Sequence, residues 1–513
     1  MGHCRRYARV LKKSRQPGVS RGHSTKASAK GRPEFFNQGS SRQMSKDDKE
    51  PKPRRSYKQG NLFEGQGGAL GKPEGGTNRA TMRAELFSRL EVQRALTTGI
   101  VDKISEHGAL AKAFQEVKGN RGSAGIDGVS LEEYERQLTA HIRRLHEGLP
   151  KGEYQPQAVR GVEIPKANGG KRLLGIPTVE DRVVQQSIQN ALQRVYDPYF
   201  SEYSYGFRPG RSAHQAVEQA ACYVMEGKVW VVDIDLKSFF DEINHERLMS
   251  RLRKAISDER LLKLIHRYLK AGLMQDGLCS QRVAGTPQGG PLSPLLSNIV
   301  LDELDRELEA RGLSFARYAD DCNIFVNSQR SAERVMASLI RFIEEKLKLK
   351  VNREKSGVRR CDQVKFLGHT VEQNGKIRIA DASIKRLKMK IREVTKRNRG
   401  MTFTQVIAET NRVIQGWAMY YRRCNTWLSK LRDMDGWIRK RLRCYALKQH
   451  QKRYPTYRFL RSLGVGENQA WYAVMYRKWW PMANYQPVMK AMGIRWFAEQ
   501  GLKSLAAVQA VKR

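Results

Sequence analysis

Residues 316–326 have the sequence ARYADDCNIFV, in which two adjacent aspartates interrupt an apolar run. The apolar arms predict two strands joined by a tight turn, with Asp320 and Asp321 at its tip and at least one of them facing a cleft. Adjacent carboxylates repel each other unless a cation neutralises them. The segment therefore indicates a cation-binding turn, although Asp-Asp is also an ordinary turn sequence on a solvated surface.

A second candidate strand, residues 228–236, carries two more aspartates. Its alternation places apolar side chains on one face and Asp233 and Asp235 on the other. A carboxylate late in this strand would supply the ligand that a two-ion site still needs. Oxygen ligands favour Mg²⁺, and two such ions ~3.5–4 Å apart can promote in-line displacement at a phosphate. The alternative is a core strand that ends in capping aspartates.

A glycine-rich loop lies between these two strands in the sequence. Residues 288–291 (QGGP) allow close backbone approach, and a second proline follows at position 294. Apolar residues at helical spacing from Leu296 to Leu308 predict a helix after the loop. Such a loop and helix can support a base pair, whereas a lone Gly-Pro loop would indicate only a turn.

The chain before these motifs predicts helices and a hairpin. Residues 84–150 have helical apolar spacing, broken by a polar loop at residues 120–130. Residues 158–176 predict a hairpin, because Asn168-Gly169-Gly170 is a typical hairpin turn between alternating arms. Strands and helices alternate irregularly along the chain, which favours an α+β fold over a doubly wound sheet.

The composition changes after about residue 380. Residues 383–399, 403–423 and 427–450 predict three helices with basic faces, and four tryptophans follow among more Arg and Lys. This pattern indicates a separate helical domain. A helical appendage with a solvated charged face is the alternative.

The whole chain is strongly basic. Its 513 residues include 94 Lys and Arg against 52 Asp and Glu, a formal net charge of +42. A field of this sign concentrates polyanions, so RNA or DNA is the expected partner class. Part of the excess lies in residues 1–80, whose composition predicts a disordered basic tail that superficially looks like an organelle transit peptide.

Cysteine spacing and hydropathy indicate the cellular setting. The seven cysteines are scattered without C-x-x-C spacing, so neither a zinc site nor a disulfide framework is expected. No apolar run reaches the ~18–20 residues that span a bilayer. We expect a soluble protein of a reducing compartment, the bacterial cytoplasm rather than an organelle, associated with the nucleoid when bound to DNA.

Eight blocks occur in an order that resembles group II intron reverse transcriptase–maturases. They are NRGSAGIDGVS, IPKANGGKRLLGIPTVEDRVVQQ, YSYGFRPGRSAHQA, VDIDLKSFFDEINH, GTPQGGPLSPLLSNI, RYADD, LKLKVNREKSG and VKFLGHTV. The resemblance covers residues from about 118 to 371, and Gly416–Tyr421 resembles the signature of the family's domain X. It implies an α+β right-hand polymerase: fingers and an antiparallel palm sheet over residues 81–378, then an all-α thumb and maturase domain over residues 379–513.

The resemblance also implies an activity and a set of partners. The chain would be an RNA-directed DNA polymerase, a nucleotidyltransferase with a two-metal mechanism, and a maturase that promotes splicing and intron mobility. Its partners would be its group II intron RNA, an RNA template with a DNA primer, dNTPs and target DNA. Two alternatives remain open: an RNA-binding splicing cofactor with an idle polymerase site, and a bacterial reverse transcriptase used in defence, which should lack the domain after residue 380.

Individual residues receive roles by the same resemblance. The expected ligands of two Mg²⁺ ions are Asp235, Asp320 and Asp321, with Asp235 preferred over Asp233. Lys355 would protonate or neutralise the pyrophosphate, and Phe240 would be the steric gate against the ribose 2′-hydroxyl. The other expected nucleotide contacts are Lys166, Arg172, Gln288 and Gly289. The expected primer grip is Phe366, Leu367 and Gly368. The residues expected to bind RNA are Lys385, Arg386, Lys388, Lys390, Arg392, Lys396 and Arg397.

The chain departs from family members that end in a zinc-bound His-Asn-His endonuclease. No paired cysteines follow Cys444, and only His450 lies beyond it. We therefore expect no zinc. A nick, a replication fork or single-stranded DNA would have to supply the primer.

Overall fold

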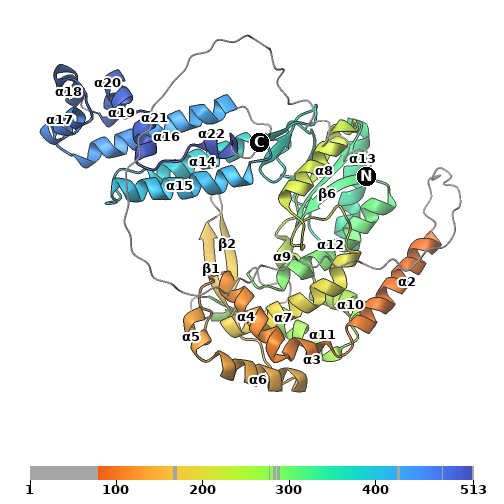
Figure 1. Ribbon diagram of the computed structural model, residues 1–513. Helices are drawn as coiled ribbons and strands as arrows, with labels where there is room; N and C mark the ends of the chain where they lie inside the picture. The colour runs from red at the N-terminus through yellow and green to blue at the C-terminus, as the bar shows by residue number, and fades with distance from the viewer. Residues whose placement is uncertain are drawn as a thin grey trace, which may run out of the picture. The chain divides into compact units, whose positions relative to one another are not determined.

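The computed structural model describes residues 79–165, 170–275, 278–280, 285, 289–424, 428–476 and 478–510 (Figure 1). The predicted tail lies outside these residues, apart from Arg79 and Ala80, which begin helix α2. Lys166 and Gln288 also lie outside them, as does the side chain of Arg172. Within the described part, no helix is both long and apolar enough to cross a membrane.

The N-terminal region is helical, and the loop predicted at residues 120–130 separates its helices as expected. The helices are α2 (Arg79–Leu96), α3 (Ile100–Ser105), α4 (His107–Gly119), α5 (Leu131–Arg136) and α6 (Leu138–Lys151). Ser130 begins α5 with a capping box: its hydroxyl accepts from the backbone N–H of Glu133, whose carboxylate accepts from the backbone N–H of Ser130.

The predicted hairpin is confirmed and belongs to a four-stranded sheet. Strands β1 (Val159–Pro165) and β2 (Lys171–Ile176) pair antiparallel, and β4 (Leu273–Gln275) pairs parallel with β1. The order in the sheet is β2-β1-β4-β5, with β5 (Leu278–Ser280) at its edge. The turn residues 166–169 lie outside the described residues.

A second four-stranded sheet carries the aspartate motifs. Its order is β6-β7-β3-β8, with every pair antiparallel: β3 (Trp230–Ile234), β6 (Ser314–Tyr318), β7 (Asp321–Val326) and β8 (Gly357–Arg360). The predicted strand–turn–strand at residues 314–326 is confirmed. Ile234 pairs with Cys322, so one further step along both strands brings Asp235 beside Asp321. The sheet thus joins the two distant aspartate motifs at one end.

Both faces of this palm sheet are buried. Val232 and Ile324 belong to a large core cluster, whereas Val231 and Phe325, one residue away on the same strands, belong to a second cluster with helix α8 (Ala213–Met225). Burial on both faces explains why β3 and β7 carry consecutive apolar residues, Val231–Val232 and Ile324–Val326. The carboxylates therefore lie at the end of a rigid sheet.

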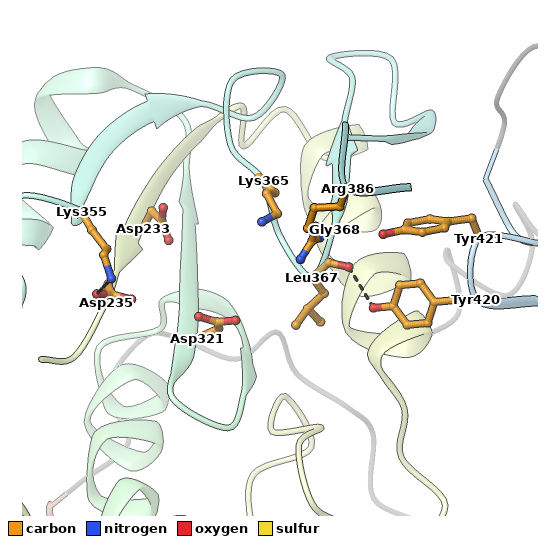
Figure 2. Close-up of a pocket in the computed structure, with 10 residues that line it drawn as sticks. All are labelled: Asp233, Asp235, Asp321, Lys355, Lys365, Leu367, Gly368, Arg386, Tyr420 and Tyr421. Atoms are coloured by element: carbon orange, nitrogen blue, oxygen red, sulfur yellow. Dashed lines mark hydrogen bonds and ion pairs between the residues drawn. The ribbon is translucent and has the colours of Figure 1, made fainter. Parts of the chain in front are cut away.

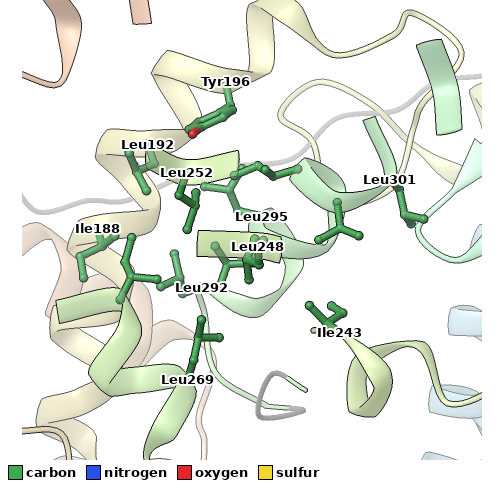
Figure 3. Packing of buried hydrophobic residues seen from close by; sticks show 14 of the residues in the cluster. Ile188, Leu192, Tyr196, Ile243, Leu248, Leu252, Leu269, Leu292, Leu295 and Leu301 are labelled. Atoms are coloured by element: carbon green, nitrogen blue, oxygen red, sulfur yellow. The ribbon is translucent and has the colours of Figure 1, made fainter. Parts of the chain in front are cut away.

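The large core is built by helices that surround the sheet. Figure 3 shows part of it, including the side chains of Leu192, Leu248, Leu269 and Leu295. These come from α7 (Val179–Tyr196), α10 (His245–Ala255), α11 (Glu259–Lys270) and α12 (Ser293–Ala310). The last of these is the helix predicted after the glycine-rich loop.

The C-terminal region is entirely helical in its described part, as predicted. It contains α14 (Asp381–Val394), α15 (Phe403–Tyr420), α16 (Leu428–Gln449), α17 (Arg453–Ser462), α18 (Glu467–Val474), α19 (Trp479–Asn484), α20 (Gln486–Ala491), α21 (Ile494–Glu499) and α22 (Leu505–Ala510). The first helix is shorter than predicted. It ends at Val394, where the Thr395 hydroxyl donates to the Ile391 carbonyl, so Lys396 and Arg397 lie in the turn that follows.

Candidate active site

A cavity of about 590 Å³ opens at the end of the palm sheet (Figure 2). Asp235 and Asp321 line it together, as predicted from the sequence, and Asp233 lines it as well. Asp320 is partly buried beside Asp321 and is not among the lining residues. Asp320 lies in the turn and Asp321 begins β7, and of these two residues only Asp321 lines the cavity.

Both the backbone and the side chain of Asp235 interact with residues that hold it in place. Its backbone N–H donates to the Ser356 hydroxyl at 2.9 Å, and its carbonyl accepts from the backbone N–H of Asn352 at 2.8 Å. The Lys355 ammonium lies 3.5 Å from its carboxylate. Lys355 therefore lies beside one of the predicted metal ligands.

The two aspartates of β3 differ in their partners. The Asp233 carboxylate accepts a hydrogen bond from the Arg359 guanidinium at 3.2 Å, and Arg359 lies on the neighbouring strand β8. Burial nevertheless raises the pKa of Asp233, and the Arg359 charge offsets only part of this increase. Asp233 is hydrogen-bonded to its cation, whereas the Lys355 ammonium lies further from Asp235, at 3.5 Å, which supports the preference for Asp235 as a metal ligand.

The pKa of the Asp321 carboxyl is raised in the site. Its pKa rises to about 6, first because the surrounding protein removes bulk water and then because Asp320, Asp233 and Asp235 repel its charge. Lys365 on the opposite wall lowers it slightly. A group of carboxylates that hinder one another's ionisation is a place where a divalent cation would relieve the repulsion.

The donor chemistry suits Mg²⁺, because the cavity presents carboxylate oxygens without sulfur or imidazole. The positions of the side chains fit a metal ion less well. Within the described residues, no three His, Cys, Asp or Glu side chains lie close enough together to hold an ion. The assigned ligands Asp235, Asp320 and Asp321 thus remain a prediction, supported by donor type and by the electrostatic repulsion at Asp321.

A buried polar network lies beneath the aspartate turn. Arg317 of β6 is fully buried and donates to the carbonyl of Ala319 at 2.9 Å and to the Asn298 side chain at 3.1 Å. Asn298 in turn donates to the Gly206 carbonyl at 2.9 Å. This network was not predicted from the sequence, although an arginine inside an apolar strand was a visible signal.

The turn itself is strained, and this network holds it. Ala319 has a φ of 57°, which is unusual for a residue with a side chain. Gly206 packs directly against the backbone of Ala319, where a side chain would collide with it. The position of Asp320 and Asp321 therefore depends on a buried arginine and on a glycine far away in sequence.

The opposite wall comes from the predicted primer grip and the C-terminal helices. Leu367 and Gly368 line the cavity, whereas Phe366 is buried in the palm core. The Leu367 carbonyl accepts from the Tyr420 hydroxyl of α15 at 2.9 Å (Figure 2). Gly368 has a φ of 80°, and a Cβ there would lie 2.5 Å from the Tyr421 hydroxyl. Thus α15 packs directly against the grip.

Two cations face the carboxylates across the cavity. Figure 2 shows Lys365 and Arg386 opposite Asp233 and Asp235, with Asp321 between them. Arg386 was predicted to bind RNA and lies here at the palm. Lys365, Tyr420 and Tyr421 were not assigned to the site from the sequence. Lys365 directly precedes the primer-grip block, which could have drawn attention to it.

The predicted nucleotide contacts are only partly described. Gly289 has a φ of 133°, and a Cβ there would lie 2.6 Å from the carbonyl oxygen of Gly175 at the end of β2.

Phe240, in α9 (Phe239–Glu242), is partly buried against Phe239, with ring centroids 5.4 Å apart, and does not line the cavity. Its role as a steric gate remains a prediction.

Comparison with known proteins identifies the family. Residues 164–371 match the family model "Reverse transcriptase (RNA-dependent DNA polymerase)", and residues 384–464 match "Group II intron, maturase-specific domain". The chain is 34% identical to Protein YkfC of Escherichia coli K12, over 55% of this chain and 83% of that protein. It is 37% identical to the group II intron-encoded protein LtrA of Lactococcus lactis, over 40% of this chain and 34% of that protein. The chain belongs to the group II intron reverse transcriptase–maturases.

Coverage of these two relatives varies, since the match spans most of YkfC but about a third of LtrA. A solved structure titled "Partial Cas6-RT-Cas1--Cas2 complex" overlaps 48% of this chain and 42% of its own, with 26% identity and a TM-score of 0.32. A TM-score of that size does not support a comparison of the two folds.

Proposed function

We propose that this chain extends a DNA primer on an RNA template, using two Mg²⁺ ions held by Asp235, Asp320 and Asp321. The observation that carries the proposal is the cavity at the end of the palm sheet, where Asp235 and Asp321 meet from two distant motifs. The family models matched by the chain support the polymerase class.

The charged residues around the cavity have different proposed roles. Bound Mg²⁺ would activate the primer 3′-hydroxyl and neutralise the triphosphate. Lys355, beside Asp235, would neutralise or protonate the departing pyrophosphate. Lys365 and Arg386, across the cavity, would hold the primer backbone by its phosphates, because paired cations on one wall suit a polyanion.

The second part of the proposal is a maturase role. The maturase-specific match and the basic residues of α14 support binding of the chain's own intron RNA through backbone and shape. The same protein would then promote splicing and copy the intron into target DNA. The match also weighs against the alternative of a defence reverse transcriptase, which was expected to lack this domain.

The test is primer extension by purified protein on an RNA template with Mg²⁺, comparing Asp235→Asn with Asp233→Asn. Loss of one metal ligand should reduce the rate by more than about 100-fold. Asp233→Asn removes the same charge two residues away and should keep most of the activity, because Arg359 already neutralises that group.

RNA binding by both variants, measured by filter retention of intron RNA, separates chemistry from recognition. Binding should be retained in each. If the wild-type protein binds intron RNA but extends no primer, the chain is a splicing cofactor with an idle site. Equal activity of Asp235→Asn and the wild type would disprove the proposed site.

A further inference from the structure

A second cavity, of about 390 Å³, lies in the C-terminal helical region, away from the aspartates. Its lining residues come from the turn after α14, from α16 and from α19. Its volume is at the lower end of the range for small-ligand pockets. The lining residues are Thr395, Lys396, Arg397, Asn398, Arg441, Lys448 and Trp479.

The lining is strongly cationic and contains no acid. None of its four basic side chains forms an ion pair with any acidic group that the structure describes. Burial and the charges of Arg392 and Arg397 lower the pKa of Arg441, which reflects a local excess of positive potential. Such a cluster is unfavourable by itself, so an anion bound there would be strongly stabilised.

Hydrogen bonds to α14 and to the turn after it hold Arg441 and Lys448 in place. The Nε of Arg441 donates to the Thr395 hydroxyl at 2.7 Å, and one Nη donates to the Arg392 carbonyl at 3.3 Å. The Lys448 ammonium donates to the Arg397 carbonyl at 3.3 Å. These bonds orient both side chains and leave other N–H groups of each available to a ligand.

Trp479 adds an aromatic residue to the lining of the cavity. It is partly buried and lines the cavity beside the cations. A cationic lining next to an aromatic face is the combination that binds single-stranded nucleic acids, whose bases are free to stack on a ring. A fully paired duplex offers its phosphates but keeps its bases stacked inside.

We propose that this cavity binds one nucleotide of single-stranded RNA, with its phosphate on Arg441 and Lys448 and its base against Trp479. The proposal rests on the proposed RNA-binding function and deepens it by naming a subsite. The nearby Lys396 and Arg397 were predicted to bind RNA, whereas the deeper residues Arg441, Lys448 and Trp479 had no assigned role.

The test measures binding of the full chain to a fluorescein-labelled 12-nucleotide oligouridylate by anisotropy at several salt concentrations. Arg441→Gln should weaken binding about 10-fold and reduce the slope of log K against log salt by about 0.7, the value for one phosphate contact on a single strand. Trp479→Leu should weaken binding about 5- to 10-fold and leave the slope unchanged, because it removes stacking and no charge.

A matched control is Arg334→Gln on helix α13 (Gln329–Arg341), which removes one exposed charge outside the cavity. It should change the affinity less than about 2-fold. Lys448→Gln is the second pocket variant, should Arg441→Gln fail to fold. The deoxy form of the oligomer distinguishes the ligand: equal binding and equal sensitivity to Arg441→Gln would show that the site accepts DNA, contrary to the proposed preference for RNA.

Failure of this subsite can be distinguished from failure of the proposed function. If Arg441→Gln and Lys448→Gln bind the oligomer as Arg334→Gln does, the subsite is wrong, whatever the primer-extension result. If the wild-type protein does not bind the oligomer at all, the subsite is also wrong. Primer extension by the wild-type protein tests the proposed function independently.

Discussion

Arg317 and Asp305 form an ion pair in which neither side chain is exposed to solvent. The Nε of Arg317 lies 2.6 Å from one carboxylate oxygen, and a second guanidinium nitrogen reaches the other oxygen. Burial raises the pKa of Asp305, and the charge and hydrogen bonds of Arg317 oppose that increase. The pair joins α12 to β6 directly beneath the strained turn at Ala319.

Removing one partner of this pair should strongly destabilise the protein. In Arg317→Met the Asp305 carboxylate would remain buried without its cation, and breaking such a pair costs about 3–5 kcal/mol. The measurement is urea-induced unfolding at pH 7. The same variant should lose polymerase activity even where it is folded, because Arg317 also holds the Ala319 carbonyl.

The double variant Arg317→Met/Asp305→Leu is the control, because it leaves no uncompensated charge. It should recover much of the lost stability while activity stays low, since the Ala319 carbonyl would still lack its donor. Recovery of both stability and full activity would contradict a positioning role for Arg317.

Gly289→Ala should impair the polymerase and destabilise the chain. The new Cβ would approach the Gly175 carbonyl oxygen to 2.6 Å, at a φ of 133° that side chains rarely adopt. We expect a loss of about 1–3 kcal/mol in unfolding free energy and a higher KM for dNTP. Gly148→Ala in α6 is the control. Nothing lies within 4 Å of its added Cβ, so it should stabilise by about 0.5–1 kcal/mol.

Tyr420→Phe should weaken the contact between α15 and the primer grip. It removes the hydroxyl that donates to the Leu367 carbonyl at 2.9 Å and should cost about 0.5–1.5 kcal/mol. Thermal unfolding of the variant measures the cost. Tyr454→Phe, on an exposed ring of α17, should leave stability unchanged within about 0.5 kcal/mol. Equal behaviour of the two variants would mean that the bond to Leu367 adds nothing.

The sequence predicted those features that depend on local pattern. The turn at Asp320 and Asp321 followed from one interruption in an apolar run, and the hairpin at residues 158–176 followed from its turn residues. Strand pairing is not a local property. That Asp235 lies beside Asp321 is set by the register of β3 on β7, and the sequence could suggest this only through its family resemblance.

What the sequence could not provide were contacts between polar groups inside the core. Arg317 is a single charge in an apolar strand and Asp305 is one of several charges in α12, and only the packing of α12 on β6 makes them a pair. The extent of the basic helix after residue 383 was also overestimated. Helical propensity continues through Lys396, whereas the chain turns after Val394 to bring α15 back against α14.

His369→Gln should change how stability depends on pH. His369 is buried beside His214, Tyr420 and Tyr421, and burial lowers its pKa to about 4, with the charge of His214 adding to the effect. Its unfolded pKa is near 6.5, so the unfolded chain binds the proton first as the pH falls. This residue therefore costs stability progressively from about pH 6.5 down to pH 4, by up to about 3 kcal/mol.

Other buried groups titrate in the same range and act in the opposite direction. Burial raises the pKa of Asp181 to about 6, so its protonation favours the folded state as the pH falls. The quantity that isolates His369 is therefore the difference between His369→Gln and the wild type, measured by urea unfolding at half-unit steps from pH 4.5 to 7.5. The wild type should lose stability relative to the variant below about pH 6.5. A constant difference across the range would mean that His369 remains as easily protonated in the folded chain as in the unfolded one.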